Sequence, residues 1–374
     1  MTIHRGAPAQ ALVLVYIFLA LTNSLIMNQL PRRLLVLVGV LLLVYEATGF
    51  RSMKYEQYFL YVLGAWIAAA LTVNGILFGE WVQESVYVPG NIGVALALCR
   101  GHLSTRSTLI VLYGAAIYFA YRLLTVSSPT AIHQILVTGS ANGISGFLIL
   151  LTGLHYAVAR AEGAAIRLLP AIACLIVSAL TLGRSGMTSA ALLLAGVAVY
   201  DLVRERSTGR RVAKGVVYLG SALVLALLVI PRLEAISFIF ERFSEFGLGS
   251  DARDRIWQEY GTSLDGLPTL IGHGREEIFA GFTNVHNSYI LWHKSMGLMA
   301  IPLYLLAALA LGRAFLRDWL LFVILAALFF RAFFDELILP FRLFDFLFFY
   351  LVCTALVTLP ARRPVYPLAS PVEA

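Results

Sequence analysis

The sequence predicts an all-α polytopic integral membrane protein with about 12 transmembrane helices and a helical extracytoplasmic cap between the ninth and tenth spans. Three observations predict this fold class. The 374 residues are 60% hydrophobic and 13% charged, with a mean hydropathy of +0.83, whereas a soluble domain is about half apolar. Apolar stretches of roughly 17–25 residues, long enough to cross a bilayer as helices, recur along the chain. One long hydrophilic segment, residues 232–285, interrupts them.

Hydropathy predicts one integral-membrane domain over residues 1–374, with residues 232–285 as an extracytoplasmic loop or cap within it. The first apolar run has no small-residue cleavage site before the next span, so we expect it to remain as a helix. In chain order the predicted spans are 9–27, 34–50, 57–79, 85–99, 107–126, 140–158, 168–183, 186–203, 215–231, 285–311, 318–334 and 338–360.

Basic residues in the short loops predict the orientation of these spans. The densest cluster lies in residues 204–214, which the positive-inside rule places in the cytoplasm. Alternation then puts both termini and most other basic loops on the same side, with Arg32 and Arg33 as exceptions. The formal charge of +7 is explained by topology and does not require nucleic acid. The cap and the short turn at 183–186 fall on the extracytoplasmic side.

The cap is expected to be helical in its first half. Residues 233–246 have the spacing of an amphipathic helix that lies at the membrane interface. A second helix is predicted to begin at Ser250 or Asp251, with acidic residues in its first turn. The apolar face of this second helix is predicted to carry Ile256, Trp257, Tyr260 and Leu264. Glycines and a proline make residues 265–282 rich in turns.

Arg184 is the first candidate functional residue. It stands between two apolar runs, and an arginine at membrane depth is costly unless it faces a polar cavity or a partner. The alternative is that its side chain snorkels from a helix end to the interface. Gly183 and Gly186 favour a functional role, since glycine lets a bulky anion approach the backbone.

Three further arginines lie in the cap. Arg253 shares a helix face with Trp257, whereas Arg255 is turned away from that face. The planar guanidinium suits phosphate, because it makes bidentate hydrogen bonds and stays charged. A solvated helix would also show the alternating charges of this stretch, and taken alone that interpretation is the better one. Arg275 is a weaker case of the same kind.

His286 precedes the tenth span, with Asn284 nearby and Asn287 beside it. Neutral imidazole can take a proton from a hydroxyl near neutral pH, which makes His286 a candidate general base. The alternative is a helix start, in which Asn284 or Asn287 is the cap and His286 has no role; for the stretch taken alone this is the better interpretation. His293, two turns deeper, is interpreted as a helix-packing residue.

No metal site and no cofactor are predicted. His273, His286 and His293 fit no zinc spacing, and only Glu276 and Glu277 lie near one of them, His273. The sequence also contains no P-loop, GxSxG elbow or dinucleotide fingerprint, so ATP-driven and serine-hydrolase chemistry have no support.

Taken together, these segments resemble the O-antigen ligase and O-antigen polymerase superfamily. That superfamily is marked by an arginine and a tryptophan with three residues between them, a Gly-x-Gly turn, and His-Asn followed after nine residues by glycine. The matching segments here are Arg184 in a short outer turn, RDRIW at 253–257, GHG at 272–274, and HNSYILWHKSMG at 286–297. The ligase form expects Gly, Thr or Tyr three residues after the last glycine, and Ala300 departs from it. Ligase and polymerase both remain open.

The resemblance implies a membrane glycosyltransferase with a GT-C-like fold in the bacterial inner (cytoplasmic) membrane, active at the periplasmic face in lipopolysaccharide or polysaccharide biosynthesis. Its donor would be a glycan on undecaprenyl diphosphate, and its acceptor a lipid A-core sugar. The superfamily is metal-independent and inverts the anomeric carbon. In this assignment His286 is the general base, and Arg184 and Arg253 stabilise the departing diphosphate. The expected substrate-binding residues are Arg255, Arg275, Trp257 and Asn287.

Two alternatives are kept. A polymerase would use a lipid-linked glycan as acceptor and join repeat units. A transporter or flippase for a lipid-linked sugar is more distant, because such proteins place polar groups at the bilayer midplane, typically between inverted repeats, and no repeat is evident here. Membrane lipids are the only other partners expected. A structural scaffold would leave Arg184 and His286 unexplained.

Overall fold

The computed structural model describes residues 6–25, 29–48, 55–78, 85–125, 135–136, 141–181, 183–205, 207–229, 251–338 and 344–358. Regular secondary structure in these residues is helical throughout, and a helix overlaps each predicted span. The helices of the bundle are α1 (Ala7–Leu25), α2 (Gln29–Thr48), α3 (Tyr55–Phe78), α5 (Tyr87–Cys99), α6 (Thr105–Thr125), α7 (Ala141–Glu162), α8 (Leu169–Leu180), α9 (Arg184–Arg204), α10 (Thr208–Val229), α15 (Ile301–Arg317), α16 (Trp319–Phe333) and α17 (Asp345–Leu356).

Six helices in the described part of the chain are long and apolar enough to cross a membrane. Four more apolar helices are shorter, at 10–17 residues. A helix satisfies its own backbone hydrogen bonds, which is what a segment needs in lipid. The six long candidates are Ala7–Leu25, Tyr55–Phe78, Thr105–Thr125, Asn142–Glu162, Arg184–Arg204 and Ser288–Arg317.

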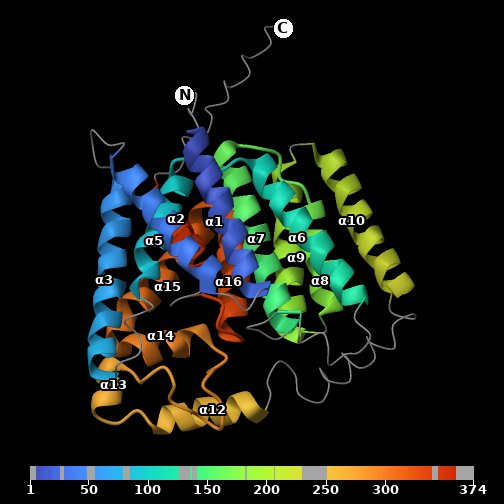
Figure 1. The fold of residues 1–374 in the computed structure, drawn as a ribbon. Coiled ribbons are helices and arrows are strands. Elements are labelled where there is room, and N and C mark those ends of the chain that lie inside the picture. The colour runs from blue at the N-terminus through green and yellow to red at the C-terminus, as the bar shows by residue number, and fades with distance from the viewer. Residues whose placement is uncertain are drawn as a thin grey trace.

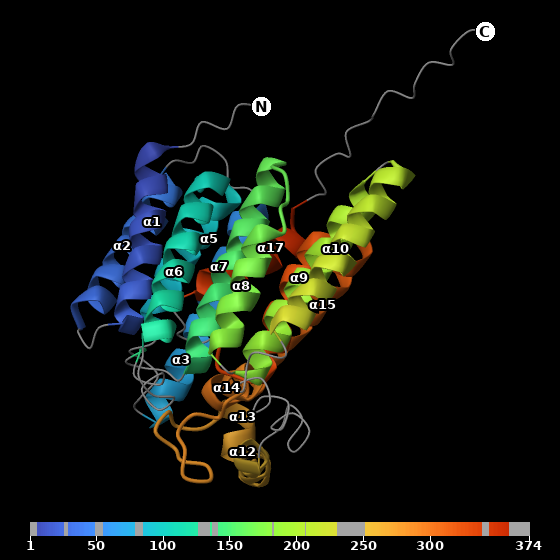
Figure 2. The same ribbon diagram turned by 90° about the vertical axis from the view of Figure 1, so that its right-hand side faces the viewer.

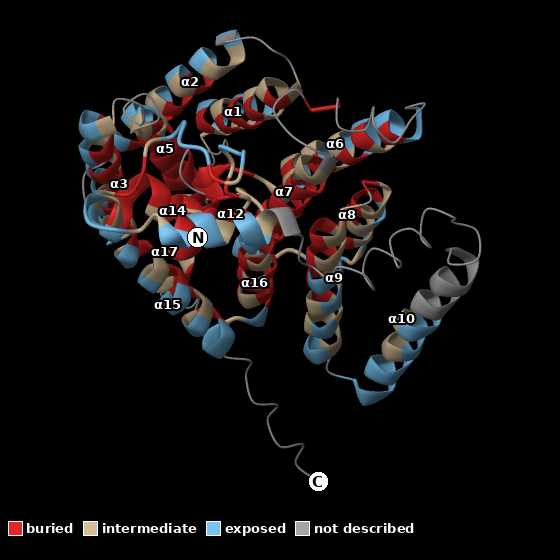
Figure 3. Ribbon diagram, turned by 90° about the horizontal axis from the view of Figure 1, so that it is seen from below, coloured by how far each residue is buried: buried red, intermediate tan, exposed pale blue. Residues whose placement is uncertain are grey.

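The helices form a bundle with α7 and α17 near its centre, where most of their residues are buried (Figure 3). α10 lies at the edge and packs on α9 (Figures 1 and 3). Glycines allow α2 and α5 to cross closely. A Cβ atom on Gly39 would lie 2.5 Å from the Cα of Gly90, and one on Gly93 would lie 2.5 Å from the carbonyl oxygen of Gly39. Small residues of this kind let apolar helices approach closely in a membrane.

The predicted span 285–311 coincides with the candidate span Ser288–Arg317, but the helix in it is not uninterrupted. The structure divides this stretch into α14 (Ser288–Met296), a 3₁₀ turn η3 (Gly297–Ala300) and α15. Gly297 has φ 55° and ends α14, and Pro302 lies in the first turn of α15, where its missing N–H costs nothing. The apolar run hides this break from hydropathy.

The described part of the cap contains α12 (Asp251–Thr262) and α13 (Leu267–Ile271), which lie with α14 across one end of the bundle, here named the cap end (Figures 1 and 2). The predicted apolar face is confirmed: Ile256 and Tyr260 are buried in a small core, and Trp257 and Leu264 pack on it. The amphipathic helix predicted at 233–246 lies outside the described residues. The basic turn between α9 and α10 lies at the opposite end of the bundle (Figure 1).

Candidate functional site

The His-Asn motif begins at a capped helix. Asn287 is the N-cap of α14, and its side-chain oxygen accepts hydrogen bonds from the N–H groups of Tyr289 and Ile290, at 2.8 and 3.1 Å. Gly297 is the C-cap, and α14 has nine residues. The nine residues between Asn287 and Gly297 are therefore the helix itself, and these two motif residues are its caps. This capping occupies the side-chain oxygen of Asn287, one of the residues expected to bind substrate.

The glycines of the motif allow two backbone segments to touch. Gly272 has φ 86°, and a Cβ atom there would lie 2.3 Å from the carbonyl oxygen of Lys294. A Cβ atom on Gly297 would lie 2.2 Å from the carbonyl oxygen of Leu270. The N–H of His273 donates to the carbonyl of Lys294 at 2.7 Å. Only glycine fits these positions, so the GHG turn is joined tightly to the end of α14.

A buried lysine in α14 fixes the loop that precedes this helix, residues 275–283. Lys294 is 1% exposed, and its ammonium donates to the carbonyl oxygens of Arg275, Glu277 and Thr283 at 3.0, 2.9 and 3.0 Å. A buried charge is tolerated only when such bonds replace its hydration. The sequence pattern does not single out Lys294, because its partners are backbone groups.

The interpretation of His293 as a packing residue is confirmed. Its Nε2 donates to the carbonyl of Thr269 at 3.1 Å, and its Nδ1 lies 2.6 Å from the Tyr260 hydroxyl. His273 is likewise bonded, to Ser263 and to Glu277, at 3.0 and 2.8 Å. Both histidines therefore join the cap helices to α14.

His286 differs from these two histidines. It lies just outside α14 with φ 51°, in the left-handed region that non-glycine residues seldom adopt. Its backbone N–H donates to the side-chain oxygen of Asn284 at 2.7 Å, and its ring is half-buried at 6.3 Å from the ring of Phe282. The helix is capped by its neighbour, so capping does not account for His286. Strained residues of this kind cluster at functional sites, where the surrounding structure holds them.

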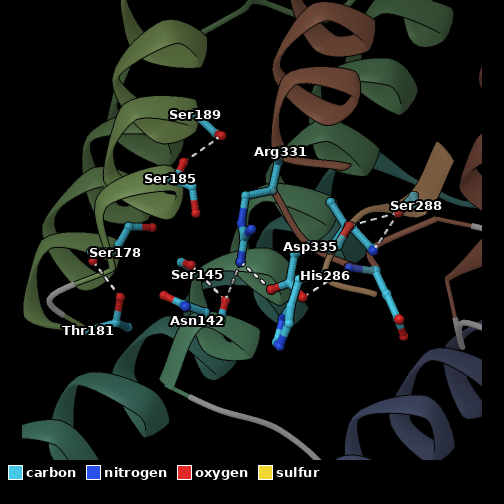
Figure 4. A network of polar contacts seen from close by, with 12 residues as sticks. Asn142, Ser145, Ser178, Thr181, Ser185, Ser189, His286, Ser288, Arg331 and Asp335 are labelled. Atoms are coloured by element: carbon cyan, nitrogen blue, oxygen red, sulfur yellow. Dashed lines mark hydrogen bonds and ion pairs between the residues drawn. The ribbon is translucent and has the colours of Figure 1, made fainter. Parts of the chain in front are cut away.

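The turn that follows α16 lies beside the His286 segment (Figure 4). The N–H of Val285 donates to a carboxylate oxygen of Glu336 at 2.9 Å. The hydroxyl of Ser288, fully buried, donates to the carbonyl of Asp335 at 2.9 Å and accepts from the N–H of Leu337 at 2.8 Å. These bonds fix His286 relative to the end of α16.

That end of α16 carries a buried ion pair. Arg331 is 0% exposed, and its Nη2 donates to Oδ2 of Asp335 at 2.7 Å and to the carbonyl of Asn142, in α7, at 2.9 Å (Figure 4). Oδ1 of Asp335 accepts from the N–H of Glu336 at 2.9 Å. The site prediction missed both members of the pair. The signal was a charge inside an apolar helix with an acid four residues later, the rule already applied to Arg184.

Arg253 and Arg184 join this ion pair in one cluster of charges. The guanidinium of Arg253 is half-buried, 5.9 Å above the ring of Phe334. Burial lowers the pKa of Arg253, the Asp335 carboxylate raises it, and the positive charges of Arg331 and Arg184 lower it further. Charges act on one another this way only at short range, so α9, α12 and α16 bring their charged residues to one site.

The same charges surround His286. Burial lowers the pKa of its imidazole below the ordinary value of 6.5. Asp335 and Glu336 raise this pKa, whereas Arg253 and Arg331 lower it. The imidazole is therefore neutral near pH 7, which is the form that can accept a proton.

Of the other expected substrate-binding residues, one packs against the His286 segment and two are exposed. The Trp257 indole donates to the carbonyl of Val285 at 2.9 Å and meets the ring of Phe333 edge-on at 5.4 Å, so it docks α12 on the His286 segment. Arg255 is exposed. Arg275 is also exposed, and its Nε lies 3.7 Å from a carboxylate oxygen of Glu276.

The glycines beside Arg184 have a packing role. A Cβ atom on Gly183 would lie 2.1 Å from the side-chain oxygen of Asn142, and one on Gly186 would lie 2.1 Å from the hydroxyl of Ser145. They let the start of α9 approach α7 closely, which differs from the anion approach expected from the sequence. Buried hydroxyl residues line the same ends of α8 and α9: Ser178, Thr181, Ser185 and Ser189 (Figure 4).

In the part of the chain that the structure describes, no group of three or more His, Cys, Asp or Glu side chains is placed to hold a metal ion. No family model, curated protein or solved structure matches the chain.

Proposed function

We propose that the protein is a membrane glycosyltransferase that moves a glycan from undecaprenyl diphosphate to an acceptor sugar, with the charge cluster at the cap end as its active site. One observation carries the proposal. Arg184, Arg253 and His286, singled out in three separate segments of the sequence, come together in the fold, and Arg331 and Asp335 join them. The motif resemblance supplies the substrate class.

The arginines suit the leaving group. Cleavage of the sugar–diphosphate bond develops negative charge on the diphosphate, and cations fixed where that charge forms lower the barrier most. Arg184 and Arg253 offer permanent charge and planar donors, and Arg184 is the first residue of α9, at the positive end of its helix dipole. We assign both to the diphosphate.

His286 suits the acceptor. An acceptor hydroxyl attacks the anomeric carbon from the face opposite the diphosphate, and inversion follows. As the new C–O bond forms, the hydroxyl proton passes to the His286 imidazole, while the electron pair of the broken bond leaves with the diphosphate. A neutral, half-buried imidazole is ready for this step.

The fold suits a lipid-linked donor. Six apolar helices of membrane-spanning length provide the embedding, and the cluster lies at the cap end, away from the basic turn between α9 and α10. By the positive-inside rule the basic end faces the cytoplasm, so we place the active site at the periplasmic face of the inner membrane. Twelve spans and a GT-C-like fold belong to the same proposal.

The proposed acceptor is a lipid A-core sugar, and reconstitution tests it. Purified protein in vesicles receives undecaprenyl-diphosphate-linked glycan with and without lipid A-core. Glycan attached to the core, only when core is present, supports the ligase assignment. Lengthened lipid-linked chains without core would show a polymerase instead. Vesicles that only move the donor between leaflets, with no new glycosidic bond, would overturn the proposal.

A further inference from the structure

Arg331 is the member of the charge cluster that is wholly shielded from solvent. Its side chain is 0% exposed, and among the described residues its Nε and Nη1 have no hydrogen-bond partner. Each buried donor left unsatisfied costs about 1–3 kcal/mol, and more in a charged group. A hydrophobic side chain of the same size would avoid this cost, so packing alone does not explain an arginine here.

The bonds that Arg331 does make hold a carboxylate. Asp335 lies beyond the end of α16, where the helix no longer fixes its side chain. Nη2 of Arg331 bonds Oδ2 of Asp335 and, at the same time, the carbonyl of Asn142 at the start of α7. The Asp335 carboxylate is thereby attached to the helix bundle, while His286 belongs to the segment that enters α14.

Charges from several elements face His286. α16 and the turn after it contribute Asp335, Glu336 and Arg331, and α12 contributes Arg253. The charge of Arg184, in α9, acts in turn on Arg253. Two acidic side chains raise the pKa of the imidazole, and two basic side chains lower it. Loss of Arg331 would remove one cation and release one carboxylate, and both changes favour the protonated ring.

We propose that Arg331 is a positioning residue that holds the Asp335 carboxylate to α7 and α16, so that it does not pair with His286 and the imidazole stays free to accept a proton. The role of His286 as a proton acceptor rests on the proposed function, whereas the placement of the charges does not. Arg331 acts through Asp335 and need not touch substrate.

A histidine titration tests this inference without any transfer assay. Protein labelled with ¹⁵N-histidine is titrated in detergent micelles, and the His286 signal is assigned as the one lost in His286→Gln. Arg331→Met is expected to raise the pKa of His286 by about one unit or more, because an opposite charge within about 4–6 Å shifts a pKa by 1–3 units. Arg331→Gln, which keeps a donor for the Asn142 carbonyl, is expected to shift it in the same direction if the methionine variant does not fold.

Asp335→Asn is the matched control, and the double variant completes the cycle. Asp335→Asn is expected to lower the pKa of His286, and Arg331→Met/Asp335→Asn to return it towards the wild-type value. An unchanged or lower pKa in the folded Arg331 single variant would overturn the inference. In the transfer assay the acidic limb of the rate–pH profile of the same single variant should move to higher pH by the same amount as the pKa of His286. If the wild type transfers no glycan while the titration shifts as stated, the proposed function fails and the positioning role stands.

Discussion

The junction at Gly297 gives a prediction whose size follows from the structure. Alanine at Gly297 would have to adopt φ 55°, ψ −139°, a conformation used almost only by glycine, which costs about 1–3 kcal/mol. Its Cβ would also lie 2.2 Å from the carbonyl oxygen of Leu270 and 2.4 Å from the backbone nitrogen of Ile271. Neither atom can move like a flexible side chain, so overpacking adds about 1–3 kcal/mol. We expect Gly297→Ala to destabilise the protein by about 2–6 kcal/mol in total.

Two other glycines separate these contributions. Gly281 has φ 84° with no atom within 4 Å of an added Cβ, so Gly281→Ala should show the backbone cost alone. Gly312 lies within α15 with the same open space and no positive φ, so Gly312→Ala should be neutral or stabilising by up to about 1 kcal/mol.

Thermal unfolding of the purified variants in detergent, monitored by size-exclusion chromatography, ranks the variants by stability. The expected midpoints fall from Gly312→Ala and wild type, through Gly281→Ala, to Gly297→Ala. If Gly297→Ala unfolds no earlier than Gly281→Ala, the close contact of Gly297 with the backbone of Leu270 and Ile271 is wrong. The nine-residue spacing would then need an explanation other than a helix held at both caps.

Three further predictions concern the charge cluster. Arg184→Lys should lower glycan transfer nearly as much as Arg184→Ala, because lysine keeps the charge but loses the planar fork; near-wild-type rates for the lysine variant would contradict a bidentate role. The acidic limb of the rate–pH profile should be centred below pH 6.5, because burial lowers the pKa of His286 and the base acts in its neutral form; a limb centred well above pH 6.5 would contradict this. EDTA should leave transfer unchanged in a quantitative assay, whereas inactivation reversed by Mg²⁺ or Mn²⁺ would contradict a mechanism that relies on arginine.

Much of the fold is predictable because a helix satisfies its own backbone hydrogen bonds, so one apolar run in the sequence is enough to form it in lipid. Hydropathy therefore finds each helix of the bundle, including short ones such as α8 and α17, but not α13 in the cap, which lies in a stretch predicted to be rich in turns. It does not find the break at Gly297, since glycine is apolar enough to leave the run uninterrupted. The apolar face of α12 is predictable from its period, because a partner for that face is needed wherever the helix lies.

The site is predictable only in part. Three members of the site are prominent in the sequence because each is polar beside an apolar run or in a recognisable motif: Arg184, Arg253 and His286. Their proximity in the fold depends on long-range packing, which no local pattern encodes. Arg331 was overlooked because a single charge does not end a strongly apolar span. Its partner Asp335 lies one residue past the predicted end of that span.

The most direct test of the account compares two histidine variants in the reconstituted transfer assay, with rates expressed per folded molecule. His286→Gln removes the proposed base, and transfer should fall by about 10²–10⁴-fold while the protein still folds. His293→Gln, matched in chemistry but placed in a packing contact with Tyr260 and Thr269, should lower thermal stability and leave the rate per folded molecule near that of the wild type. Transfer by His286→Gln at the wild-type rate would contradict the assignment of this cluster as a glycosyltransferase active site.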